Sequence, residues 1–119
     1  MRRIALAVVF ALTATPAFAI DANAPEQCIT GPIEKTYGGT PWLVASCSDG
    51  KSLVFVAKEG GKAAPFEFDL TFTGNDYDLT GHGKGDRKFT DAAYADLQKL
   101  TGKDVLDLLQ ATKAAKPKN

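Results

Sequence analysis

The chain has 119 residues, of which 45% are hydrophobic and 24% charged, and its 14 basic residues equal its 14 acidic ones in number. This length suits one small domain and leaves no room for two. The balanced charge argues against a nucleic-acid partner, because proteins that bind nucleic acids concentrate basic side chains against the phosphates.

The amino terminus has the pattern of a secretory signal peptide. A positive start, Met1-Arg2-Arg3, precedes an apolar stretch over residues 4–12 and a small-x-small cleavage site, Ala17-Phe18-Ala19. We predict a signal peptide over residues 1–19 and a single domain over residues 20–119. Apolar residues follow the two arginines at once, which favours the general secretory route over the twin-arginine route. The apolar stretch is too short to span a bilayer, so we expect a periplasmic or secreted protein with no membrane insertion after cleavage.

Two cysteines, Cys28 and Cys47, remain after the predicted cleavage. An even number of cysteines in an oxidising compartment predicts a disulfide, and two cysteines allow only one pairing. Closing a loop of about 20 residues stabilises a fold by roughly 3 kcal/mol. A redox pair or a metal site is disfavoured, because the spacing is not Cys-x-x-Cys and the chain has one histidine.

The first predicted strand, Ile29 to Tyr37, carries Pro32, and proline confines a strand to a sheet edge or a bulge. Gly38-Gly39 turns the chain into a second strand, Trp42 to Cys47. The simplest register between these strands sets Cys28 opposite Cys47.

Asp49-Gly50 predicts a two-residue hairpin turn into a third strand, Ser52 to Lys58. The register that follows pairs Val44 with Phe55, Trp42 with Ala57, Leu43 with Val56 and Ala45 with Val54. Because both faces are apolar, these are predicted to be the central strands.

The clearest alternation in the chain follows Pro65. Phe66, Phe68, Leu70 and Phe72 share one face, while Glu67, Asp69, Thr71 and Thr73 share the other. Gly74-Asn75 fits a type II′ turn, and the implied register pairs Phe72 with Tyr77, Leu70 with Leu79 and Phe68 with Gly81. This strand therefore has one wet face.

The last 30 residues change to a helical period. Thr90 is predicted to cap a helix from Asp91 to Leu100, with Phe89 and Tyr94 as a hydrophobic staple. Thr101 with Asp104 resembles a capping box for a second helix, which ends at Pro117. The buried stripes are Ala93, Leu97 and Leu100 on the first helix and Val105, Leu108, Leu109 and Thr112 on the second. The fold class is α+β: an antiparallel β-meander of four or five strands with two C-terminal helices packed on one face.

No residue set reaches the specificity of a catalytic motif. Gly81 to Asp86 alternates glycines but lacks the ending of a phosphate loop, and its glycines are read as space for Phe66 and Phe68. His82 is expected to be an exposed turn histidine, and serines that could join it in a triad come from different strands. Asp76, Asp78 and Asp86 fail as a calcium loop, because position twelve is Arg87. Glu67 and Asp69 are read as carboxylates of a solvated strand face. We expect no catalytic residue, no metal and no cofactor.

Residues 45–56, ASCSDGKSLVFV, resemble the strand-turn-strand of periplasmic C-type lysozyme inhibitors. The resemblance covers about a dozen residues and implies inhibition of a hydrolase. Those inhibitors have a closed sheet, a cysteine partner near the C-terminus and a Ser-Gly loop. Here the expected partner is Cys28, no Ser-Gly occurs, and helices end the chain.

The sequence thus favours an exported, non-enzymatic domain that binds another envelope or secreted protein. The alternatives are an inhibitor of a hydrolase, such as lysozyme or a peptidase, and a small hydrolase or metal-dependent protein. The expected binding surface is a rim formed by Gly81 to Lys88, the Gly38-Gly39 turn and Trp42, because interfaces combine aromatic anchors with charge. Its named residues are Trp42, His82, Lys84, Asp86 and Arg87. Trp42 is also a candidate for the core.

Overall fold

The computed structural model describes residues 27–115, so the predicted signal peptide and Pro117 lie outside the described residues. The elements are β1 (Thr30–Tyr37), β2 (Thr40–Ser46), β3 (Leu53–Ala57), β4 (Phe66–Phe72), β5 (Tyr77–Gly83), α1 (Arg87–Gln98) and α2 (Gly102–Ala114).

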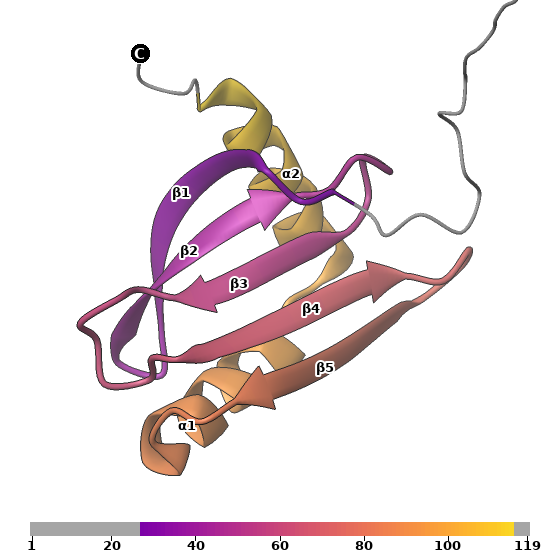
Figure 1. Ribbon diagram of the computed structural model, residues 1–119. Coiled ribbons are helices and arrows are strands. Elements are labelled where there is room, and N and C mark those ends of the chain that lie inside the picture. Colours follow the sequence, from indigo (N-terminus) through magenta and orange to yellow (C-terminus); the bar gives the residue numbers. More distant parts are fainter. Residues whose placement is uncertain (1–26, 116–119) are drawn as a thin grey trace, which may run out of the picture.

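The five strands form one antiparallel sheet in chain order, β1-β2-β3-β4-β5. Both helices lie against one face of this sheet, and no helix of the described residues covers the other face (Figure 1). The predicted α+β meander with two C-terminal helices is therefore confirmed. The sheet is open, with β1 and β5 as its edges, and so differs from the closed sheet of the lysozyme inhibitors.

The register between β2 and β3 is the predicted one, and it pairs Trp42 with Ala57 and Val44 with Phe55. The predicted two-residue turn was wrong, because the strands are joined by a four-residue loop. The backbone N–H of Cys47 donates to the carbonyl of Ser52 (2.9 Å), and residues 48–51 lie between them. The Asp49 carboxylate closes this loop by accepting hydrogen bonds from the backbone N–H groups of Lys51 and Ser52.

The register between β4 and β5 is also the predicted one. Gly74 begins the connecting turn with a φ of 108°, a value that suits glycine. A Cβ at Gly81 would lie 2.6 Å from a ring carbon of Phe68 and 2.9 Å from one of Phe66. The reading that glycine makes room for these rings on the neighbouring strand is confirmed.

Strand β1 lies at the sheet edge and is bulged, as Pro32 predicted, with a register shift between Thr30 and Ile33. Tyr37 pairs with Thr40, and an unbroken register from this pair would set Cys28 opposite Asp49. The shift takes up one residue of this two-residue offset, and Cys28 and Cys47 form the expected disulfide. A disulfide is typical of proteins of oxidising compartments.

The start of α1 differs from its prediction. Asp86 is the N-cap, and its carboxylate accepts a hydrogen bond from the backbone N–H of Lys88 (2.9 Å). Thr90 lies inside the helix and is buried, so the predicted cap and its staple were wrong. The capping box of α2 is confirmed, with reciprocal hydrogen bonds between Thr101 and Asp104.

The core lies between the sheet and the helices. Its largest fully buried side chains are Trp42, Phe55, Phe68 and Leu53. Helix α2 buries its whole predicted stripe. Helix α1 buries Ala93 and Leu97, but Leu100 lies beyond the end of the helix and is half-buried. The ring of Phe68 packs against Trp42 (centroids 5.3 Å apart) and stacks on Tyr94 of α1 (5.9 Å). A buried hydrogen bond between the hydroxyls of Thr112 and Ser46 (2.8 Å) joins α2 to β2.

Candidate functional site

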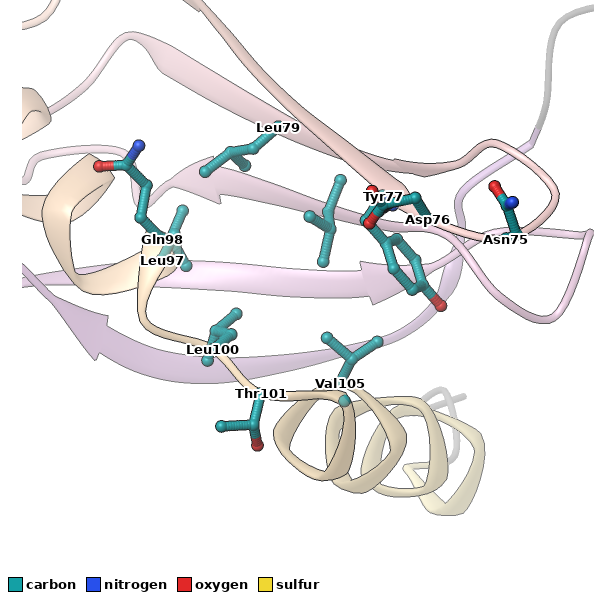
Figure 2. A pocket seen from close by; sticks show the side chains of 11 residues that line it. Asn75, Asp76, Tyr77, Leu79, Leu97, Gln98, Leu100, Thr101 and Val105 are labelled. Atoms are coloured by element: carbon teal, nitrogen blue, oxygen red, sulfur yellow. Dashed lines mark hydrogen bonds between the residues drawn. The ribbon is translucent and has the colours of Figure 1, made fainter.

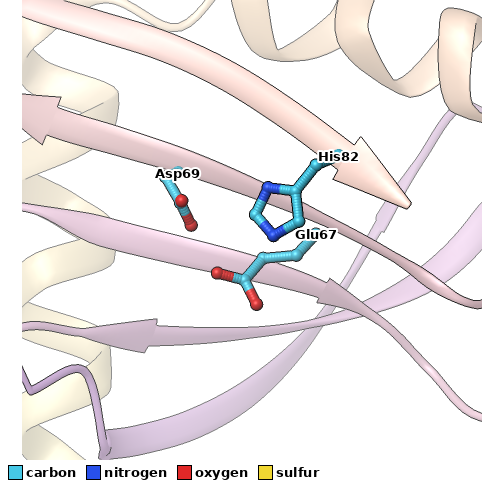
Figure 3. Close-up of side chains that lie close together, drawn as sticks. All are labelled: Glu67, Asp69 and His82. Carbon is cyan, nitrogen blue, oxygen red and sulfur yellow. The ribbon is translucent and has the colours of Figure 1, made fainter.

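Three polar side chains converge on the open face of the sheet. Glu67 and Asp69 are two residues apart on β4, so their side chains share a face, and Glu67 pairs directly with His82 of β5. One ligand atom from each residue can be chosen so that all lie within 4.8 Å of one another. Figure 3 shows the three side chains gathered over β4 and β5. We call this set the open-face cluster.

The two carboxyl groups of this cluster are strongly coupled. A hydrogen bond to Asp69 raises the pKa of Glu67 to about 7, partial burial and repulsion by the Asp69 charge act in the same direction, and His82 opposes them. Like charges held this close favour a shared proton over two negative charges. Asp69 Oδ1 is buried and has no hydrogen-bond partner among the described residues. The cluster is therefore an acidic site in which one carboxylate oxygen can still accept a hydrogen bond or bind a cation.

Sequence reasoning placed these residues separately and did not predict the cluster. His82 is exposed as expected, but it belongs to strand β5 and not to a turn. Glu67 and Asp69 were read as part of a fully solvated face, yet both are half-buried. The signal was available, because the predicted pairing of Phe68 with Gly81 also sets Glu67 opposite His82.

A second feature is a hollow of about 380 Å³ between β5 and α1, here called the β5–α1 hollow. Its lining includes Tyr94, Arg87 and His82, together with the aromatic side chains of Phe66 and Phe68. Tyr94 is 38% exposed, although its ring stacks on Phe68. The hollow thus offers an aromatic surface beside a guanidinium group.

The structure separates the predicted rim residues. His82 and Arg87 line the β5–α1 hollow, whereas Lys84 and Asp86 do not. Asp86 caps α1, and Arg87 pairs with Asp91 within that helix (3.0 Å), so these two rim residues belong to the start of α1.

Trp42 is a core residue and not an exposed anchor. Its side chain is fully buried, and its indole N–H donates to the carbonyl of Tyr37 (3.0 Å). Of the adjoining turn, Gly38 packs against the backbone of Ala93 in α1, and its N–H donates to Asp96 (2.7 Å). The rim therefore loses its aromatic anchor, and Tyr94 is the aromatic group that the surface presents there.

An apolar groove of about 480 Å³ runs between the β4–β5 hairpin and the corner where α1 meets α2 (Figure 2). The apolar floor of the groove is formed by Leu70, Leu79, Leu97, Leu100 and Val105. Its polar edge is formed by Asn75, Asp76, Gln98 and Thr101. An apolar floor with a polar edge is the usual anatomy of a binding groove.

Two serines that could join His82 in a triad, Ser46 and Ser52, are hydrogen-bonded to other side chains. Ser46 is buried and hydrogen-bonds to Thr112, and the Ser52 hydroxyl donates to Asp49 (2.6 Å). Within residues 27–115, the open-face cluster is the group of ligand-type side chains close enough to share a metal ion, and Asp76, Asp78 and Asp86 form no such group.

Comparisons with family models, curated proteins and solved structures found no match. No helix in the described part of the chain is long and apolar enough to cross a membrane.

Proposed function

We propose that the protein is an exported, non-enzymatic module that binds another protein of the cell envelope or the secreted fraction. The predicted signal peptide supports export, and the disulfide between Cys28 and Cys47 is consistent with an oxidising compartment. Periplasmic or secreted placement is part of this proposal.

The observation that carries the binding role is the β5–α1 hollow. Tyrosine and arginine are enriched among the residues that dominate binding energy, and both line this hollow, at Tyr94 and Arg87. Of its aromatic lining, Phe68 belongs to the core and Phe66 packs against the core. A preformed aromatic surface lowers the entropy cost of binding, because little has to be ordered when a partner arrives.

Inhibition of a hydrolase is the second candidate, and residues 45–56 support it through their resemblance to lysozyme inhibitors. The loop of residues 48–51 projects between β2 and β3, with Asp49 and Lys51 exposed. Stoichiometric loss of lysozyme or peptidase activity on titration with the purified protein would establish this reading in place of a non-inhibitory module.

Site-specific photo-crosslinking in the producing cells tests the binding role. A benzoylphenylalanine at position 94 keeps an aromatic ring in the hollow, and the same group at Leu106 of α2, which is 52% exposed, is the matched control. We expect one dominant adduct from position 94, absent from position 106 and reduced by Arg87→Ala.

Two results would contradict the proposal. One is the same set of adducts from both positions, which would mean that the hollow selects no partner. The other is turnover of a peptidoglycan or peptide substrate by the purified protein, because the protein would then be an enzyme.

A further inference from the structure

The open-face cluster combines the side chains that first-row transition metals prefer. Glu67 and Asp69 each offer a carboxylate oxygen, and His82 offers an imidazole nitrogen. Zinc binds histidine nitrogen and carboxylate oxygen at about 2.0–2.2 Å, so ligand atoms around one ion lie up to roughly 4 Å apart. The limit of 4.8 Å between the ligand atoms is therefore within a small side-chain rotation of a common site.

We propose that Glu67, Asp69 and His82 form a binding site for a divalent transition-metal ion, with Zn²⁺ as its representative, on the open face of the sheet. The site goes beyond the proposed binding function and does not depend on it. Imidazole distinguishes this ligand set from the all-oxygen sites of Ca²⁺ and Mg²⁺. Three protein ligands leave coordination positions for water or a further ligand.

A second observation at the cluster is the Oδ1 atom of Asp69. Asp69 Oδ1 is buried without a hydrogen-bond partner in the described part of the chain. A buried acceptor without a partner is costly, and the cost is larger for a charged group. A cation at the cluster would satisfy this oxygen.

Among the described residues, no lysine or arginine side chain is paired with either carboxylate of the cluster. Within residues 27–115, lysine or arginine side chains form ion pairs with Glu34, Asp91 and Asp107, but not with Glu67 or Asp69. A carboxylate pair without a neutralising side chain attracts an external cation more strongly than carboxylates that are already paired.

The backbone holds the three ligands in place before any ion arrives. Antiparallel pairing fixes Glu67 opposite His82. The next pair along the two strands is Phe68 with Gly81, and Phe68 separates Glu67 from Asp69 on β4. On the opposite face, Phe68 is 2% exposed and packs in the core. Ligands on rigid strands keep their mutual geometry better than ligands on loops, so little order has to be gained on binding.

Calorimetric titration of the metal-stripped, tag-free protein with zinc chloride tests this site. An affinity tag must be absent, because His82 is the one histidine of the chain and a histidine tag would bind zinc itself. We expect one zinc ion per chain. His82→Ala, and separately the double variant Glu67→Gln with Asp69→Asn, should each weaken binding by about tenfold or more.

The matched control is Asp78→Asn, which removes an exposed carboxylate from the same strand as His82 and should change zinc affinity by less than about twofold. Zinc affinity unchanged by His82→Ala would overturn the proposal. Calcium or magnesium binding as tight as zinc binding would also overturn it, because an all-oxygen set would then suffice.

A measurement on the wild-type protein alone covers the case in which a variant does not fold. Zinc bound at this cluster must shift the NMR signals of the His82 ring protons, Hδ2 and Hε1. Zinc binding that leaves these resonances unmoved would place the ion elsewhere and refute the site. Photo-crosslinking from position 94 reports on the partner surface, so either proposal can fail without the other.

Discussion

Truncation of Phe68 to alanine tests the packing between the sheet and the helices. The ring is 2% exposed and touches the rings of Trp42, Phe66 and Tyr94. A buried phenylalanine removes about 150–250 Å² from water, which at about 25 cal/mol per Å² corresponds to roughly 4–6 kcal/mol. Partial collapse of the cavity recovers some of this loss, so we expect Phe68→Ala to lower the free energy of unfolding by about 3–5 kcal/mol.

Urea unfolding followed by the fluorescence of Trp42, the one tryptophan, measures this cost, with circular dichroism as a second probe. Phe68→Leu keeps most of the buried volume and should cost less, so it reports on the site even if Phe68→Ala does not fold. Phe72→Ala is the matched control, because Phe72 is only half-buried at the end of the same strand. A loss below about 1 kcal/mol for Phe68→Ala would refute the reasoning.

Two further predictions concern the disulfide and the carboxyl pair. Replacing Cys28 and Cys47 together by serine opens a crosslink with a sequence separation of 19, and we expect the free energy of unfolding to fall by about 2–4 kcal/mol. An unchanged urea midpoint, or two titratable thiols in the native wild-type protein, would contradict this. The pKa of Glu67 is raised to about 7 in the folded protein, so the folded protein keeps a proton on Glu67 that the unfolded chain loses near pH 4.5. The free energy of unfolding of the wild-type protein should therefore fall, relative to that of Glu67→Gln, as the pH rises from 4.5 to 7. Equal pH slopes for the two metal-free proteins in urea unfolding would rule this out.

The registers of both predicted hairpins followed from short-range information. Gly74-Asn75 and the alternation around Phe68 specify one pairing, because a slip by one residue would turn the apolar side chains to water. Asp49-Gly50 gave the correct register but the wrong loop length. The Asp49 side chain closes a wider loop by hydrogen bonds to Lys51 and Ser52. Side-chain acceptance of this kind competes with a tight backbone turn, and composition alone does not rank the two.

The start of α1 shows a second limit of local reasoning. Asp86 and Thr90 are both good N-cap residues, and they are four residues apart, so either choice keeps the same helical face toward the core. The tertiary contacts decide between them, because Thr90 is buried beneath the sheet and Asp86 is exposed.

The open-face cluster was missed for a different reason. The predicted register already placed Glu67 opposite His82, but each residue was judged on its own strand. The half-burial of Glu67 and Asp69 depends on neighbouring strands on both sides of β4, and this could not be inferred from alternation alone.

The hydrogen bond between Thr112 and Ser46 spans 66 residues, whereas every strand pairs with the next one in the chain. Hairpins between consecutive strands close short loops and form early, but α2 follows all five strands and can dock only after they have been made. Until then, the apolar face around Trp42 and Val44 lacks its cover. A chain that leaves a ribosome or a translocation channel amino terminus first therefore completes this core only after α2 has emerged. Until then, the uncovered apolar face makes the partly delivered chain prone to aggregation.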